Sequence, residues 1–418
     1  MADAALHLFQ GLGIELEYMI AAKDTLAVLP VSDKLLYSVA GEYVCAIERG
    51  EIGWSNELVL HVIELKTNGP VPELDALPAL FQENVRTINR RLVSLGARLL
   101  PTGMHPLMDP FTQTRLWPHD NNPIYEKYNE IFDCRGHGWA NVQSVHFNLS
   151  FAGDDEFARL HAALRLILPL LPALSASSPL IDGKESGFLD TRLAFYAKNQ
   201  KKLPSISGNV IPEKGIRSKR EYEEKILKKM YADIAPYDKE KILQEEWLNS
   251  RGAIARFERN AIEIRIIDTQ ECPLADISLC ALVLESVKNM AGRRWVSFEK
   301  QLNWDEAPLA ALFKDVVKNG RHSVISDKKY LSAFGYEKNA SCTVGQLWEH
   351  ILDAVMPRDN PRSRVWRGPL ELILREGSLA ERILMALAGD FSPEKIVYIY
   401  RRLSECLAEG KMFEPGEK

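Results

Sequence analysis

Segments far apart in the sequence place charged side chains at every second position. In GLGIELEYMI, Glu15 and Glu17 alternate with Ile14, Leu16 and Tyr18. A β-strand sends alternate residues to opposite faces, so two carboxylates would stand side by side above an apolar underside. Taken alone, this pattern is also typical of a half-exposed strand whose acidic face is solvated.

Two later segments repeat the arrangement with other chemistry. In NVQSVHFNLSF, the same alternation puts Ser144, His146 and Asn148 on one face of a strand. In RNAIEIRIID it puts Glu263 and Arg265 opposite a row of isoleucines. Each predicted strand therefore has an apolar underside and a polar top that carries imidazole, carboxylate or guanidinium groups.

A fourth predicted strand, HVIELKT, adds Glu64 and Lys66. Carboxylates that crowd on one face are tolerated only when a cation neutralises them. Oxygen ligands with one imidazole suit magnesium or manganese, with water and nucleotide phosphates in the remaining positions. We therefore predict a site for metal-held phosphate, with these metal ligands: Glu15, Glu17, Glu64, His146 and Glu263.

The usual motifs for nucleotide binding and hydrolysis are missing from the sequence. It contains no G-x-x-x-x-G-K-[ST] loop and no G-x-G-x-x-G after a strand. It also lacks H-E-x-x-H and a G-x-S-x-G elbow. The predicted cofactors are ATP and Mg²⁺ (or Mn²⁺), with ATP held through its metals.

Composition narrows the class of protein. The 418 residues include 57 acidic and 52 basic side chains, a formal charge of -5, so we expect no nucleic-acid partner and no membrane association. The start MADAALHLFQ lacks the pattern of a secretory signal, and the six cysteines are scattered without a CxxC pair. A cytoplasmic location is expected.

Periodicity divides the chain into a strand-rich part and a helical part. The first 150 residues are predicted to hold strands and one clear helix at 72–95, and residues 201–219 are the best candidate for a flexible flap. Residues 214–251 are charge-dense and predict a solvated helix, and residues 261–268 predict a strand. Further helices are predicted at 155–174, 276–290, 307–318, 344–355, 370–388 and 393–408.

A set of short motifs resembles a known family. GIELEY, ELKT, GMHP, VQSVHFNLSF, LSASSPLIDG, the TR of Thr191 and Arg192, and AIEIRIIDTQ occur in the order seen in the glutamate-cysteine ligase type 2 (carboxylate-amine ligase) family. The resemblance covers residues 11–300. Each motif alone is weak, and the set is specific.

The resemblance implies an α+β fold of the glutamine-synthetase-like superfamily. Its antiparallel sheet is curved into a funnel, with ATP at one end, substrates at the other and metals between. We expect a catalytic domain at 1–300 and an all-helical C-terminal region at 301–418. The five predicted metal ligands match the family's by position. Glu263 and Arg265 are the predicted catalytic residues, and Arg265 and Lys66 the predicted nucleotide contacts.

Substrate recognition is less defined than the reaction. The residues predicted to bind substrate are His105, Gln143, Ser144, Asn148 and Arg192. A simple turn at His105, a rim position for Gln143 and a bracing role for Arg192 are equally open. The segment from His105 to Tyr128 departs from the family pattern, which puts the substrate in doubt more than the reaction.

The predicted function is an ATP-dependent ligase that joins a donor carboxylate to an acceptor amine through an acyl-phosphate. By resemblance, glutamate is the donor and cysteine the acceptor, although relatives can use another amino acid or amine. Two alternatives stay open: a phosphagen-type kinase on the same fold, and a non-catalytic binding scaffold. A homodimer is one assembly that the sequence leaves open.

Overall fold

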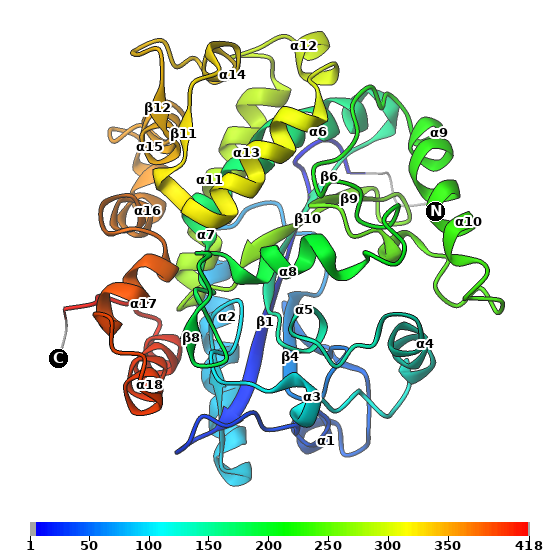
Figure 1. Ribbon diagram of the computed structural model, residues 1–418, viewed down its shortest axis with the longest axis vertical. Coiled ribbons are helices and arrows are strands. Elements are labelled where there is room, and N and C mark those ends of the chain that lie inside the picture. The colour runs from blue at the N-terminus through cyan, green and yellow to red at the C-terminus, as the bar shows by residue number, and fades with distance from the viewer. Residues whose placement is uncertain (1–5, 417–418) are drawn as a thin grey trace.

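The central feature of the fold is one antiparallel sheet. The structure, a computed structural model, describes residues 6–416. The strand order is β2-β3-β4-β1-β6-β10-β9, and β5 also pairs with β1, which runs through the middle of the molecule (Figure 1). The strands of this sheet are β1 (Leu12–Ala22), β2 (Ala46–Ile47), β3 (Ile52–Asn56), β4 (Val62–Thr67), β5 (Ala97–Leu100), β6 (Ser144–Ser150), β9 (Ala253–Arg256) and β10 (Ala261–Asp268).

The predicted alternation along the strands is confirmed. Ile14, Leu16 and Tyr18 of β1 are fully buried in one core together with Phe147 of β6 and Ile264 of β10. The intervening charged residues are left to the opposite face. Burial of the apolar undersides thus fixes which side of the sheet is polar, because a shift of one residue would turn charges into the core.

Helices cover the apolar face. Helix α2 buries side chains at spacings of three and four residues, and α11 contacts both α2 and α6. The helices up to residue 291 are α1 (Ser32–Ala40), α2 (Leu77–Leu92), α3 (Pro110–Gln113), α4 (Asn122–Phe132), α5 (His137–Ala140), α6 (Gly153–Ile167), α7 (Pro172–Ser175), α8 (Thr191–Asn199), α9 (Lys219–Tyr222), α10 (Lys228–Ile234) and α11 (Pro273–Ala291).

The C-terminal part adds further helices, of which α15 to α18 lie on the left in Figure 1. They are α12 (Phe298–Leu302), α13 (Glu306–Asn319), α14 (Lys328–Ser332), α15 (Val344–Val355), α16 (Arg364–Glu376), α17 (Leu379–Leu387) and α18 (Pro393–Glu409). Strands β11 (Val324–Ile325) and β12 (Cys342–Thr343) pair here, so the region is not all-helical as predicted. The predicted division at residue 300 falls inside α12 and stays a prediction.

Several predicted elements need correction. The helix predicted at 72–95 begins at Leu77, because Val71 bridges to Leu12 and a turn follows. The helix predicted at 370–388 is two helices: Gly377 has a φ of 103°, and Ser378 starts α17 with a capping box. Helices α1 and α4 were also missed in the first 150 residues.

The segment predicted as a flexible flap is packed instead. Leu203, Ile206, Val210, Ile211 and Ile216 all belong to the main core. The charge-dense stretch after it forms α9, a π-helical turn (Glu223–Leu227) and α10, with one buried face. The charged pattern therefore marked the solvent side of a docked helix.

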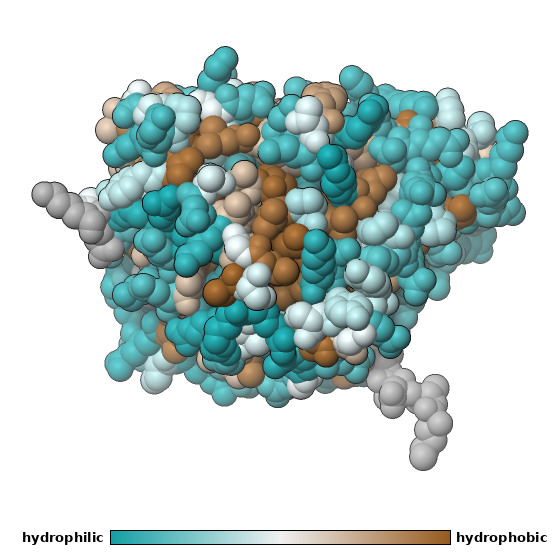
Figure 2. All heavy atoms as spheres, turned by 90° about the horizontal axis from the view of Figure 1, so that it is seen from below, coloured by the Kyte–Doolittle hydropathy of each residue, from teal (hydrophilic) through white to brown (hydrophobic). Residues whose placement is uncertain are grey.

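Among the described residues, no helix is both long and apolar enough to cross a bilayer. Figure 2, which views the molecule from below, shows apolar side chains gathered across the middle of that face within a hydrophilic surround. A large share of the surface of folded proteins is apolar, so this gathering by itself assigns no partner.

Candidate active site

The polar face of the sheet is laid out in rows by the strand register. Glu15 of β1 lies opposite Lys66 of β4 on one side and opposite His146 of β6 on the other. In the next row, Glu17 lies opposite Glu64. Strand pairing thus brings together four of the side chains predicted from spacing to share one face, with Lys66 beside them.

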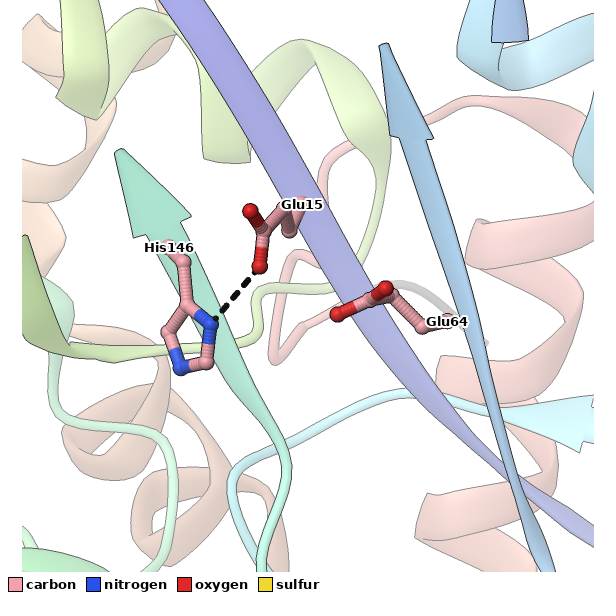
Figure 3. Close-up of side chains that lie close together, drawn as sticks. All are labelled: Glu15, Glu64 and His146. Atoms are coloured by element: carbon pink, nitrogen blue, oxygen red, sulfur yellow. Dashed lines mark hydrogen bonds and ion pairs between the residues drawn. The ribbon is translucent and has the colours of Figure 1, made fainter. Parts of the chain in front are cut away.

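Glu15, Glu64 and His146 form a first group of potential ligands. Their ligand atoms lie within 4.8 Å of one another, and the three side chains point toward one another above β1 (Figure 3). His146 Nδ1 lies 3.1 Å from Glu15 Oε2. Burial would raise the pKa of Glu15 and lower that of His146. The hydrogen bond between them and the neighbouring opposite charges together outweigh burial, so the pKa of Glu15 falls and that of His146 rises.

A second group shares Glu64 and adds a residue that the sequence analysis did not find. Ligand atoms of Glu17, Glu57 and Glu64 again lie within 4.8 Å of one another. Burial and the neighbouring charges of Glu64 and Glu17 raise the pKa of Glu57 well above its usual value. Burial also raises the pKa of Glu17. Three carboxylates this close repel one another unless a cation lies between them.

Glu263 lies in a different setting. Its carboxylate is 3.0 Å from Arg256 Nη1 and 3.2 Å from Arg265 Nε. Burial would raise the pKa of Glu263, but the charge of Arg265, followed by those of His146 and Arg256, lowers it. Within the described residues, Glu263 belongs to neither three-residue group, and its predicted role as a metal ligand stays a prediction.

A β-bulge brings Asp268 to the polar face. The pairing of β10 with β6 shifts between Ile264 and Ile267, so that Asp268 lies opposite Ser144. One extra residue in a strand reverses the alternation beyond it. The Asp268 carboxylate accepts hydrogen bonds from Arg192 Nε and from Ser178 Oγ, the latter at 2.7 Å. The Asp268 carboxylate thereby fixes the position of the Arg192 guanidinium.

Two cavities open on this face. The larger, about 650 Å³, is lined by Glu17, Glu57, Glu64 and Arg265, and by a set of aromatic side chains; we name it the aromatic cavity. The other, about 610 Å³, is lined by Glu15, by apolar side chains and by four glycines, and we name it the glycine-lined cavity. Both are lined by Lys66, so they adjoin.

The far side of the aromatic cavity is built from elements outside the sheet. Tyr125 and Tyr128 come from α4, Trp139 from α5, and Trp247 from a 3₁₀ turn at Glu246–Leu248. The ring centroid of Tyr128 is 5.5 Å from that of Trp139 and 6.0 Å from that of Trp247. We name these four residues the aromatic wall.

Comparison with known proteins identifies the family. The family model of "Glutamate-cysteine ligase family 2(GCS2)" matches residues 11–401. The chain belongs to this family. An uncharacterised protein from Archaeoglobus fulgidus is 32% identical over 385 residues, which cover 92% of this chain and 95% of that protein.

More distant similarities agree with this placement. A relative in Corynebacterium glutamicum, provisionally named glutamate–cysteine ligase 2, is 28% identical over 190 residues, 44% of this chain and 46% of that protein. The solved structure of a glutamate–cysteine ligase from Francisella tularensis in complex with AMP has a TM-score of 0.63 at 14% identity, covering 97% of this chain and 90% of that chain. That likeness shows the shared fold and confirms the predicted fold class.

Membership of glutamate-cysteine ligase family 2 places the chain among the carboxylate–amine ligases. It does not identify the acid and the amine that the protein joins. The two ligand groups fit a family that handles phosphate. Hard oxygen donors with one imidazole suit Mg²⁺ or Mn²⁺. Burial, followed by the charges of neighbouring carboxylates, raises the pKa values of Glu17 and Glu57, and a bound cation would offset both effects.

The residues predicted to bind substrate are only partly brought together. Ser144 and Arg192 line the aromatic cavity, and Asn148 lines the glycine-lined cavity. His105 and Gln143 line neither. Both ring nitrogens of His105 are engaged by backbone groups, those of Leu26 and Leu107, and burial lowers its pKa to about 4.

The sequence held a usable signal for one missed residue. Glu57 follows directly after strand β3, two residues beyond Ser55, and Ser55 lies opposite Glu64. Period-two alternation therefore puts Glu57 on the same face as Ser55 and Glu64. Asp268 and the aromatic wall had no comparable signal.

Proposed function

We propose that this protein activates a carboxylic acid by transferring the γ-phosphate of ATP to it, and then passes the acyl group to an amine. The observation that carries the proposal is the pair of ligand groups that share Glu64 and lie beside Arg265 on one face of the sheet. Ser144 Oγ lies 3.0 Å from His146 Nε2, but it also lies 3.1 Å from Glu17 Oε2, and both neighbours are proposed metal ligands. We therefore propose that the acid itself accepts the phosphoryl group.

Divalent ions, Mg²⁺ or Mn²⁺, would be held by Glu15, Glu64 and His146 and by Glu17, Glu57 and Glu64, and we retain Glu263 as a further predicted ligand. When bound, such ions neutralise the charge of the triphosphate and of the phosphoryl group in transfer. Ser55 donates a 2.7 Å hydrogen bond to Glu64, which fixes the shared carboxylate in place.

Arg265 is proposed to stabilise the phosphoryl group during transfer. Its guanidinium is held by Glu263 and donates to the backbone carbonyl of Asn249 at 3.1 Å. A planar guanidinium fixed in this way can donate to two phosphoryl oxygens without reorganising. Lys66, 2.8 Å from Glu64, is placed where the two cavities adjoin and would contact the nucleotide phosphates.

The glycine-lined cavity is proposed to bind the nucleoside part of ATP. Its walls include Leu12, Ile47 and Trp54, and it adjoins the metal ligands through Glu15 and Lys66. At Gly53, a Cβ would lie 2.3 Å from Asn68 Oδ1, so any side chain there would displace the wall. The flat, partly apolar base of a nucleoside fits the glycine-lined cavity better than a charged amino acid does.

Arg192 is proposed to orient the donor acid. Asp268 and the N-cap Asp190 hold it at the start of α8, and its Nη2 has no hydrogen-bond partner within the described residues. A buried guanidinium with a spare donor is suited to a carboxylate. Glutamate is the first donor to test, since its α-carboxylate would bind Arg192 while the side-chain carboxylate reacts.

The proposal is tested by trapping the activated acid. The protein is incubated with ATP, Mg²⁺, hydroxylamine and single candidate acids, and hydroxamate and ADP are measured together. Formation of both in equal amounts supports an acyl-phosphate. Production of AMP and pyrophosphate, or of ADP without hydroxamate from any acid, would contradict it.

A further inference from the structure

The two sides of the aromatic cavity differ completely in charge. Among the described residues that line it, the cationic side chains come from the sheet, from the β9–β10 turn or from the first turn of α8. They are Lys66, Arg192, Arg256, Arg259 and Arg265. Each already faces a carboxylate of the chain: Glu64, Asp268, Glu263, Glu15 and Glu263, respectively.

The aromatic wall has no charge. The described residues that α4, α5 and the Glu246–Leu248 turn contribute to the cavity are aromatic, aliphatic or glycine. Tyr125 is fixed by a 2.9 Å hydrogen bond that Asn56 donates to its hydroxyl. Trp139 also stacks on Phe132, with ring centroids 5.4 Å apart. The wall is therefore a braced, uncharged surface with exposed ring faces.

Helix α8 joins the two sides of the cavity. Arg192, Tyr196, Asn199 and Gln200 all line it, and their spacing puts them along one face of the helix. At the outer end, Gln200 Nε2 donates to Ser250 Oγ at 2.9 Å, while its Oε1 has no partner within the described residues. Gln200 is only 3% exposed. Gln200 Oε1 is thus a buried acceptor in the lining of the aromatic cavity that a bound donor could satisfy.

We propose that the aromatic wall binds the acceptor, and that the acceptor is a primary amine with an uncharged aromatic or apolar substituent and no carboxylate of its own. The inference rests on the proposed ligase function. The ring of the acceptor would stack on Tyr128 and Trp247, and its N–H would donate to Gln200 Oε1.

The chemistry of the step balances with such an acceptor. The amine nitrogen forms a bond to the carbonyl carbon of the acyl-phosphate, the bond from that carbon to the phosphate oxygen breaks, and the released phosphate takes up the proton lost by nitrogen. An amino acid such as cysteine would add an unpaired carboxylate against an uncharged wall, and burying an unpaired charge is strongly unfavourable.

The test uses acceptors that differ only in the carboxylate. With the donor that gives the most hydroxamate, phenethylamine is compared with phenylalanine, and both with cysteine, by following amide product and ADP. We expect kcat/KM for phenethylamine to exceed that for phenylalanine and for cysteine by about a hundredfold. Equal or higher values for either amino acid would overturn the acceptor inference, while hydroxamate formation would leave the ligase proposal intact.

A variant pair links the preference to the wall. Trp247→Ala should lower the ratio of the phenethylamine rate to the hydroxylamine rate by about tenfold, because hydroxylamine is too small to need the ring. Phe111→Ala removes an aromatic ring that is 69% exposed and lines neither cavity, so its ratio should match the wild type. An unchanged ratio in Trp247→Ala would overturn the inference. Absence of hydroxamate with every acid would overturn the ligase proposal and the inference together.

Discussion

The two sides of the aromatic cavity are built by opposite means. The sheet side places charged groups in fixed rows: Glu17 and Glu64 face each other across β1 and β4, and Arg265 is held by Glu263. The aromatic wall presents uncharged rings from short helices. The first arrangement can hold ions and phosphate, and the second can only select by shape and stacking. The reaction and the choice of acceptor are therefore separable in this fold.

The largest expected effect is on the sheet side. Glu64→Gln removes a charge from both ligand groups at once and should lower the rate of hydroxamate formation by about a thousandfold. Glu337→Gln, a change at an exposed residue far from both groups in the sequence, serves as the control and should leave the rate unchanged. Near-normal activity of Glu64→Gln at limiting Mg²⁺ would show that Glu64 is not a shared ligand.

Arg265→Lys comes next in size. An ammonium cannot reproduce the two-pronged contact of a guanidinium, so kcat should fall by about a hundredfold while KM for ATP changes little. Steady-state kinetics with ATP varied at saturating donor measures both constants. A raised KM with an unchanged kcat would reduce Arg265 to a contact made equally well before the transfer.

Arg192→Lys is expected to act on donor binding. The lysine keeps the charge but loses the spare nitrogen donor, so KM for the donor acid should rise by about tenfold with a smaller change in kcat. Hydroxamate formation at varied donor concentration measures it. The same KM for the variant and the wild type would indicate that Arg192 only braces Asp268.

The smallest effect concerns stability. Because the pKa of Glu57 is raised, its ionised form disfavours the folded state at pH 7.5, and this penalty disappears as the pH falls toward the usual carboxyl value of 4.5. Glu57→Gln should therefore raise the melting temperature in EDTA by about 1 to 3 °C at pH 7.5. The gain should vanish in Mg²⁺ and at low pH. A lower melting temperature in EDTA would mean that the carboxylate is stabilised without a metal.

The sheet side of the site was predictable from sequence for a simple reason. Period-two alternation assigns Glu15, Glu17, Glu64 and His146 to one face, and the buried apolar undersides leave no second choice of face. The same rule failed at Asp268, since a bulge between Ile264 and Ile267 reverses the alternation beyond it. Spacing alone does not reveal a bulge.

The aromatic wall was not predictable for a different reason. Tyr128, Trp139 and Trp247 lie on separate short elements whose place over the sheet is set by tertiary packing and not by local periodicity. Helix α4, which carries Tyr128, was itself missed. Glu57 differs from the wall, because it lies just outside β3 and a longer reading of that strand could have found it.

The central claim is that the donor carboxylate attacks ATP, and heavy-oxygen transfer tests it most directly. Donor acid labelled with ¹⁸O in the reacting carboxylate is incubated with ATP, Mg²⁺ and an amine, and the released phosphate is analysed by mass. One labelled oxygen should appear in inorganic phosphate for each amide formed, because the acyl-phosphate breaks at the carbonyl carbon. Unlabelled phosphate, or label in AMP, would contradict the account even if an amide were made.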